Sequence, residues 1–255
     1  MEYAIVTVPA APVRRKARHN KEMVNQLLFG EAVKILKIKD DTWVKVQSLH
    51  DGYEGWMTRS LLEETDQTTA ETLPDYVTAG MMNRISAGSQ ALHIPAGASL
   101  PFFDEGKTRI SRKEYTVEGP VINRKEHAPG AVLVEKLVNP WLNAPYLWGG
   151  RTPLGVDCSG FVQVIFKLMG LDLPRDAWQQ AQAGEPVKKL SEAQTGDLVF
   201  FDDKEEIVHV GILLNTETVI HASGKVRIDP IDKKGITHSE TGKRIYRLRA
   251  IRRYW

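Results

Sequence analysis

The sequence predicts two small all-β barrels followed by an α+β domain, and three observations lead to this prediction. The chain has 255 residues, more than the roughly 100 to 200 of a usual single domain. Short β-type runs separated by turn-forming residues fill its first half. From about residue 126 the pattern changes to helical segments followed by strands, which is typical of an α+β domain. We therefore expect domains over residues 1–65, 66–125 and 126–255.

Composition indicates an ordinary globular protein. The 34 Lys and Arg residues nearly cancel the 32 Asp and Glu residues, and the resulting net charge of +2 gives no argument for a nucleic-acid partner. No apolar run approaches the roughly 18 residues of a membrane span, and the single cysteine excludes an internal disulfide. At the N-terminus the basic cluster follows the first apolar stretch, which is the wrong order for a secretory signal. We expect a cytoplasmic protein that has no membrane partner.

The first half of the chain contains strands separated by turns. Four β-type runs precede residue 65, with turns at Asp40-Asp41 and Asp51-Gly52, and their spacing predicts a small barrel. These runs are YAIVTV, AVKILKI, TWVKVQSL and YEGWM. Residues 63–74, EETDQTTAETLP, contain one leucine and predict a linker. A second β-rich stretch reaches about residue 122, with a turn signal in QALHIPAGASLPFF and a strand at KEYTVEG.

Two apolar segments of the last part have helical character. GAVLVEKLVNPWL has a broad apolar face that Pro140 interrupts. CSGFVQVIFKLMG is apolar around most of its circumference and predicts a buried central helix that ends at Gly170. The expected strands that follow are GDLVFF, IVHVGILL, TVIHAS and RIYRLRAIRRY.

Cys158 lies in GVDCSGF, where a glycine-rich loop meets the predicted buried helix. A free cysteine usually packs as a small apolar residue, but polar Asp157 and Ser159 place this one at the helix start, where either neighbour can cap the helix. The N–H groups and dipole of a helix N-terminus stabilise a thiolate, and a neighbouring imidazolium lowers the thiol pKa further. We therefore predict an activated nucleophile.

His209 and His221 stand out among the seven histidines because both lie in predicted strands joined by the short connection NTET. A loop of three or five residues centred on Asn215 puts the two imidazoles directly opposite each other on one face. A loop of two or four residues turns them to opposite faces. Alternation favours the first register and leaves Gly211 to keep this face open. One imidazole then serves as the base and the second fixes its tautomer, the alternative being two histidines of a polar sheet face.

Zinc is the other chemistry open to this set. Cys158, His209 and His221 offer three ligands, but the chain has no paired-cysteine spacing and no H-E-x-x-H motif. We expect no metal and no other cofactor.

Five motifs occur together and in order: YLWGGRTPLGVDCSGF, LPRDAWQQ, TGDLVFF, VHVGI and VIHASG. Together they resemble the NlpC-type cysteine peptidases of bacterial cell-wall metabolism, over about residues 126–255. The resemblance implies a papain-like α+β domain with Cys158 as nucleophile, His209 as general base and His221 as the orienting residue. It also implies hydrolysis through a thioester, with backbone N–H groups at the helix start binding the oxyanion.

The N-terminal half looks like a bacterial SH3-like domain followed by a diverged second one. This layout is similar to endopeptidases that cleave γ-D-glutamyl-diamino acid bonds in freed peptides, so the implied substrate is the small peptidoglycan-derived peptide L-Ala-γ-D-Glu-diamino acid. Its free amine needs an anion nearby, and the candidates are Asp157 and Glu31, with Tyr53 completing the amine pocket. The resemblance also implies that further residues line the site, namely Ser159, Asp176 and the backbone of Ala177. Many members of the family have serine near position 177. Alanine lacks this hydroxyl, so we expect no side-chain role for Ala177.

Three alternatives stay open at this point. The first is a secreted hydrolase that grips intact peptidoglycan with its SH3-like domains. The second is a non-catalytic wall-binding protein. The third is acyl transfer through the same thioester, which needs only an amine in place of water.

Overall fold

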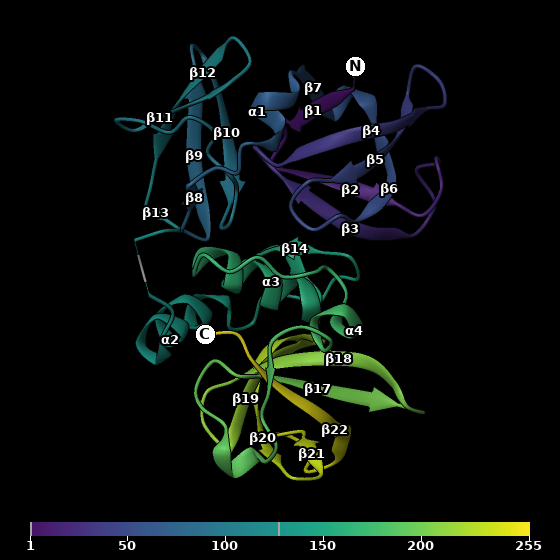
Figure 1. Cartoon of the computed structure of the whole chain (residues 1–255), viewed down its shortest axis with the longest axis vertical. Coiled ribbons are helices and arrows are strands. Elements are labelled where there is room, and N and C mark those ends of the chain that lie inside the picture. The colour runs from purple at the N-terminus through teal and green to yellow at the C-terminus, as the bar shows by residue number, and fades with distance from the viewer. Residues whose placement is uncertain (1, 127) are drawn as a thin grey trace. The chain divides into compact units, whose positions relative to one another are not determined.

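The computed structural model describes residues 2–126 and 128–255 (Figure 1). The chain divides into two compact units. The first contains the described residues before 127 together with Trp148–Pro153, and the second contains Ala128–Leu147 and Leu154–Trp255. Within the described residues, no helix has the length and apolar character that crossing a membrane requires.

The first unit begins with a seven-stranded antiparallel sheet, which confirms the predicted all-β start. Its strands are β1 (Tyr3–Val6), β2 (Ala10–Arg14), β3 (Met23–Leu28), β4 (Ala32–Ile38), β5 (Trp43–Ser48), β6 (Glu54–Thr58) and β7 (Leu62–Thr65), with the 3-10 helix η1 (Arg59–Leu61) before β7. Their order is β3-β2-β6-β5-β4-β1-β7. Val44 and Val46 of β5 alternate with less buried residues and join the core beneath the sheet. The predicted turn between β5 and β6 contains Gly52 at φ 71°, a conformation that suits glycine.

Residues 63–74 are not the linker that their composition predicts. Most of β7 lies in this segment and pairs with β1 from Tyr3↔Thr65 to Val6↔Leu62, and α1 (Gln67–Glu71) follows. The Asp66 carboxylate caps this helix by accepting the Thr69 N–H at 2.9 Å. The prediction is wrong because an edge strand needs only backbone groups for pairing, so a polar segment can extend a sheet.

The second β-rich stretch also forms sheets. Its strands are β8 (Tyr76–Thr78), β9 (Met82–Ala87), β10 (Gln90–Pro95), β11 (Lys107–Ile110), β12 (Lys113–Glu118) and β13 (Val121–Asn123). Four of them form a sheet in the order β10-β9-β12-β11, and β13 pairs with β8. Leu28 and Phe29 of the first sheet region pack in one core with Ile85 and Ile94 of the second. This shared core explains why both stretches belong to one compact unit, whereas the domain boundaries near residues 65 and 125 stay predictions.

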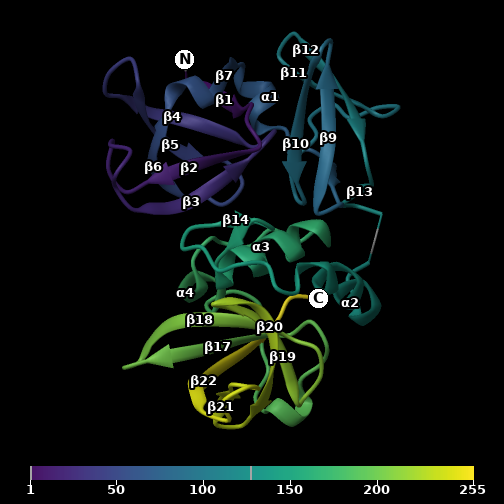
Figure 2. The ribbon, with the colours of Figure 1, turned by 180° about the vertical axis from the view of Figure 1, so that it is seen from behind.

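The second unit is α+β, with its helices ahead of its main sheet. It contains α2 (Ala131–Val138), η2 (Asn139–Trp141), β15 (Gly155–Val156), α3 (Cys158–Leu168), α4 (Ala177–Gln180), β16 (Glu185–Pro186), η3 (Leu190–Glu192), β17 (Leu198–Asp203), β18 (Glu206–Leu213), β19 (Thr218–Ser223), β20 (Lys225–Asp232), β21 (Gly235–Thr237) and β22 (Arg244–Arg253), while β14 (Arg151–Thr152) belongs to the first unit. The sheet order is β16-β22-β17-β18-β19-β20-β21, and β21 also pairs with β22. This last pairing closes β17 to β22 into a barrel (Figure 2).

Helix α3 is the buried central helix that the sequence predicts. All of its residues are buried, and it packs against β18 and β19 of the barrel. Gly170 follows it at φ 83°, as expected for a helix C-terminus. Strands β20 and β21 are missing from the sequence-based prediction, because Pro230 within β20 argues against a strand and β21 is very short.

Candidate active site

Cys158 is the first residue of α3, and only 7% of it is exposed. Asp157 caps the helix, since its Oδ1 accepts the Gly160 N–H at 2.7 Å, which confirms the predicted cap. The Cys158 N–H lies in the first helical turn and therefore has no acceptor within the helix. The thiol also lies beside the backbone N–H of Val210 on β18. Helix and barrel thus meet at this cysteine.

Arg175 forms a buried ionic cluster next to the cysteine. Its Nη1 and Nη2 donate to Asp157 Oδ1 at 3.0 Å and Oδ2 at 2.6 Å, and Nη1 also donates to Ser159 Oγ at 2.8 Å. Arg175 is 1% exposed and Ser159 is also buried. Arg175 belongs to the motif LPRDAWQQ, but its role could not be predicted because the pairing with Asp157 spans 18 positions and no local pattern encodes it.

Burial controls the protonation of the thiol. It raises the pKa of Cys158 to about 12, and the negative charge of Asp157 acts in the same direction. The Val210 N–H, the Arg175 guanidinium and the Ser159 N–H oppose this rise without overcoming it. The predicted lowering of the thiol pKa by the helix N-terminus is therefore wrong for this structure, because loss of water around the thiolate outweighs the helix contribution. The thiol is protonated at neutral pH and needs a base.

His209 on β18 and His221 on β19 lie on one face, as predicted. His209 Nε2 and His221 Nδ1 are 2.8 Å apart, and both rings are buried. Burial lowers the pKa of each histidine below its ordinary value, the neighbouring His221 and Arg227 adding to this effect for His209. The two imidazoles therefore form a neutral, hydrogen-bonded pair.

The register between these strands differs from the prediction. The strands pair at Ile212↔Ile220 and Leu213↔Val219, which centres the loop on Thr216 and not on Asn215. Asn215 explains the difference, because its Oδ1 accepts the Thr218 N–H at 2.9 Å and makes the asparagine the first residue of the turn. The loop length remains odd, so both histidines stay on one face, but they meet diagonally.

Gly211 was expected to keep the histidine face open, and this expectation is also wrong. A Cβ at position 211 would lie 2.6 Å from Val219 Cγ2 and 3.1 Å from His221 Cβ. Glycine instead allows β18 and β19 side chains to pack closely at this point.

Gly211→Ala is therefore expected to displace His221, to lower kcat and to reduce the free energy of unfolding by about 1–3 kcal/mol. Urea unfolding and steady-state kinetics measure the two effects. Gly130→Ala is the matched control, because a Cβ there meets no atom within 4 Å. If the two variants behave alike, the close packing at position 211 does not position His221.

Strand β20 adds an acid that local sequence patterns do not predict. Asp229 is fully buried, and its Oδ2 lies 3.0 Å from His221 Nε2 and 2.9 Å from Arg227 Nε. Its Oδ1 accepts the Ser239 N–H at 3.0 Å. Burial alone raises the pKa of Asp229, but the hydrogen bonds from His221 and Ser239 outweigh burial and hold the pKa well below its ordinary range.

Two tyrosines complete the surroundings. The Tyr246 ring stacks on His209 with 4.1 Å between ring centroids and 8° between planes. Burial raises the pKa of Tyr146, and the nearby Cys158 and Asp157 raise it further. Tyr146 therefore keeps its hydroxyl proton at neutral pH.

The other predicted site residues lie in both units. Asp176 is the N-cap of α4 and donates its N–H to Gln179 Oε1 at 3.3 Å, and Ala177 is the first residue of that helix. In the first unit, Glu31 is 3% exposed and its Oε2 and Oε1 accept from Arg151 Nη1 at 2.8 Å and Nη2 at 2.9 Å. Tyr53 lies between β5 and β6. Contact of these residues with a substrate stays a prediction.

Comparison with known proteins decides the family. The pattern of the NlpC/P60 family matches residues 143–244, and that of the bacterial dipeptidyl-peptidase Sh3 domain matches residues 13–62. A gamma-D-glutamyl-L-lysine dipeptidyl-peptidase of Bacillus subtilis (strain 168) is 33% identical over 220 residues, which cover 77% of this chain and 71% of the relative. The chain belongs to the NlpC/P60 family.

Two further proteins resemble this chain over most of its length. A gamma-D-glutamyl-L-lysine dipeptidyl-peptidase of Bacillus cereus is 28% identical over 257 residues, covering 88% of this chain and 75% of that relative. The crystal structure of an NlpC/P60 family protein from Bacillus cereus shares the fold, with a TM-score of 0.81, 23% identity and 99% of each chain covered. The protein is thus an NlpC/P60 cysteine peptidase with SH3-like sheets before its peptidase domain, as the sequence predicts.

Proposed function

We propose that this NlpC/P60 peptidase hydrolyses the γ-D-glutamyl-diamino acid bond of peptidoglycan-derived peptides with a free N-terminal L-alanine. The main support is that relatives named gamma-D-glutamyl-L-lysine dipeptidyl-peptidases align with most of this chain, and not with its peptidase domain alone. We propose the cytoplasm as its location and recycling of wall peptides as its role. Detection of the protein only outside the cell membrane after fractionation would contradict the location.

The proposed chemistry begins with proton transfer from the Cys158 thiol to His209, as the sulfur attacks the carbonyl carbon of the scissile amide. The oxyanion that forms accepts hydrogen bonds from the Cys158 N–H and the Tyr146 hydroxyl. When the carbon–nitrogen bond breaks, the proton on His209 passes to the leaving amine and a thioester remains. Water then attacks the thioester with His209 as base, which releases the γ-carboxylate and restores the thiol.

L-Ala-γ-D-Glu-L-Lys and its N-acetylated form together test which bond is cleaved and whether the substrate needs a free N-terminal amine. We expect release of L-Ala-D-Glu from the first peptide only, and none with Cys158→Ala. Equal turnover of the two peptides would overturn the free-amine requirement. Release of peptide from intact sacculi at a similar rate would favour the wall-hydrolase alternative.

Tyr53 is the best probe for the proposed amine pocket. Asp157 and Glu31 are each paired with a buried arginine, so their replacement would leave an unpaired buried charge and disturb folding. Tyr53→Phe removes one hydroxyl. A contact with the amine predicts a higher KM for the free-amine peptide at unchanged kcat, and an unchanged KM would exclude that contact.

The pH dependence follows from the resting protonation states. His209 accepts a proton only when neutral, and burial lowers its pKa below the ordinary 6.5, so kcat should stay constant down to a pH below 6.5 and then fall. A mechanism that needs a thiolate formed in advance would instead gain activity about tenfold per pH unit towards the thiol pKa of about 12. Measurement of kcat from about pH 4.5 to 9 distinguishes the two profiles.

A further inference from the structure

We propose that Asp229 is a positioning residue that acts through His221 to hold His209 in the tautomer with a free Nδ1. This inference deepens the proposed function, since it rests on the roles assigned above to Cys158 and His209. It follows from the order of donors and acceptors along three strands, β18, β19 and β20.

The hydrogen bonds allow one arrangement of protons. Asp229 is ionised and can only accept, so His221 Nε2, 3.0 Å from its Oδ2, is the donor. A neutral His221 with a proton on Nε2 has a bare Nδ1, which must accept from His209 Nε2 at 2.8 Å. His209 then has its proton on Nε2 and a lone pair on Nδ1. Nδ1 of His209 is therefore the atom able to take the proton of the thiol.

Hydrogen bonds hold the Asp229 carboxylate in one orientation. Arg227 Nε and the Ser239 N–H hold its two oxygens from other directions, at 2.9 Å and 3.0 Å. Asp229 and His221 are both fully buried, so water does not compete for the bond between them. A rigid, ionised acceptor enforces the tautomer, and its charge stabilises the imidazolium that forms during attack.

The charged and titratable groups around the pair come from every neighbouring element. Arg227 lies on β20 with its Nη1 2.9 Å from His238 Nε2, and both side chains act to lower the pKa of His221. Tyr246 of β22 stacks on His209. At the start of α3, Cys158 is accompanied by the charged Asp157 and Arg175. The groups nearest His221 thus act in opposite senses, Asp229 favouring its protonation and Arg227 opposing it.

This opposition gives a kinetic test. We expect Asp229→Asn to lower kcat by on the order of 10²-fold with little change in KM, and to shift the acid limb of the pH profile to lower pH. Arg227→Gln should shift the limb to higher pH. Glu206→Gln, which removes an exposed carboxylate of the strand that carries His209, is the control and should leave the profile unchanged. A purely structural role predicts less folded enzyme with an unmoved limb, and that result would overturn the inference.

A measurement without substrate separates this inference from the proposed function. In Cys158→Ala labelled with ¹⁵N-histidine, we expect His209 to show a protonated Nε2 and a bare Nδ1 in NMR spectra, and the double variant with Asp229→Asn to show mixed tautomers. A protonated Nδ1 in the first protein would overturn the tautomer assignment, whatever peptide the enzyme cleaves. If the tautomer is as expected but the wild-type enzyme does not cleave the peptide, only the proposed substrate is overturned.

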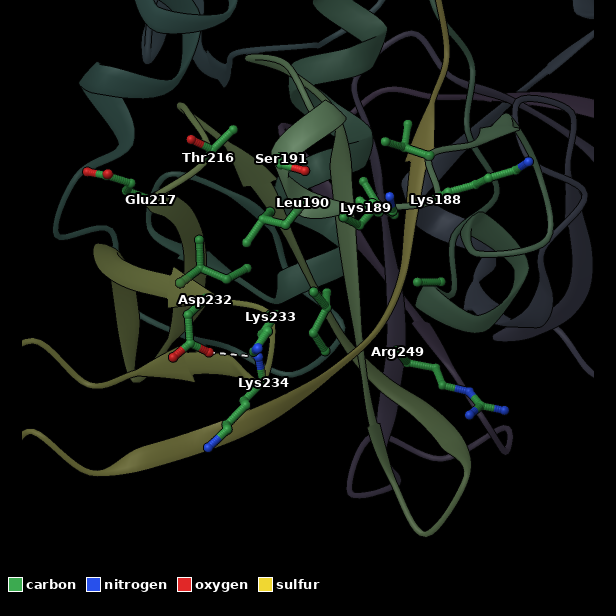
Figure 3. Close-up of a pocket in the computed structure, with 15 residues that line it drawn as sticks. Lys188, Lys189, Leu190, Ser191, Thr216, Glu217, Asp232, Lys233, Lys234 and Arg249 are labelled. Atoms are coloured by element: carbon green, nitrogen blue, oxygen red, sulfur yellow. Dashed lines mark hydrogen bonds between the residues drawn. The ribbon is translucent and has the colours of Figure 1, made fainter.

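A separate cavity in the second unit leads to an independent proposal. It has a volume of about 860 Å³ and an apolar lining that includes Leu190, Ile231 and Leu248 (Figure 3). Two lysine pairs, Lys188-Lys189 and Lys233-Lys234, lie on opposite sides of it. Its lining contains none of the residues assigned to catalysis.

The charges in this cavity are unbalanced. Within the described residues, the four lysines have no ion-pair partner, and Arg249 of the lining is 3.9 Å from Asp202. Of the two acids in the lining, Asp232 is already held by Arg244 through both oxygens, at 2.6 Å and 2.7 Å, which leaves Glu217. An excess of unpaired cations above an apolar surface suits an anionic ligand. We propose that the cavity binds a small polyanion, with its anionic groups at the lysine pairs and its carbon skeleton on the apolar lining.

Isothermal titration with tripolyphosphate and with citrate tests this site and distinguishes phosphates from carboxylates. We expect saturable binding of at least one of them to the wild-type chain, and at least a tenfold weaker binding to Lys189→Glu/Lys233→Glu. The control Lys136→Glu/Lys243→Glu changes the net charge equally outside the cavity and should bind as the wild type does. No saturable binding, or an equal loss in both double variants, would overturn the proposal.

Discussion

Cys158→Ser is expected to lower kcat/KM by roughly 10⁴-fold or more, because a hydroxyl is a much weaker nucleophile than a thiol and the proposed base, His209, removes its proton less readily. Serine is close to cysteine in size, and the Asp157 cap on α3 does not involve the sulfur. The free energy of unfolding should therefore stay close to that of the wild type. Steady-state kinetics on the tripeptide and urea unfolding measure the two quantities.

The outcome separates covalent catalysis from direct attack by water. If His209 activated a water molecule without a thioester, the serine variant would retain a large part of its activity. Mass spectrometry of the wild-type enzyme mixed rapidly with substrate adds a second check, because the covalent route predicts a transient acyl adduct on Cys158. Retention of more than about a tenth of the activity in Cys158→Ser would contradict the nucleophile assignment.

Local patterns were sufficient to predict the elements that meet at the site. The apolar circumference of residues 158–169 predicts the buried α3, and the polar Asp157 before it predicts the cap. Period-two alternation predicts that His209 and His221 share a face, and an odd loop keeps this result although the register differs. These features depend on residues close together in sequence.

The parts that the sequence did not predict depend on tertiary contacts. Arg175 reaches Asp157 from a loop before α4. Asp229 reaches His221 from β20, which the sequence does not predict as a strand because it contains Pro230. The thiol pKa depends on burial, which a helix N-terminus considered alone does not include. The polar segment after Leu62 became β7 because its backbone pairs with β1, and side-chain composition does not report such pairing.

Arg175→Met is expected to reduce the free energy of unfolding by about 3–5 kcal/mol, because it leaves the buried Asp157 carboxylate without its partner. Its side chain and that of Asp157 are 2% and 7% exposed, so water cannot replace the lost contacts. The same bidentate geometry occurs between Arg244 and Asp232, whose side chains are 39% and 55% exposed. Arg244→Met is therefore the matched control, and water and salt should keep its effect within the error of the measurement.

The comparison tests burial as the decisive variable, since residue types and bond lengths are nearly the same in the two pairs. Urea unfolding of both variants gives the free energies, and repetition at high salt adds a second criterion, because screening affects exposed charges more than buried ones. Equal destabilisation of the two variants would contradict the argument. A further replacement of Asp157 by Asn in Arg175→Met should recover part of the loss, because it removes the unpaired charge while an amide oxygen still caps α3.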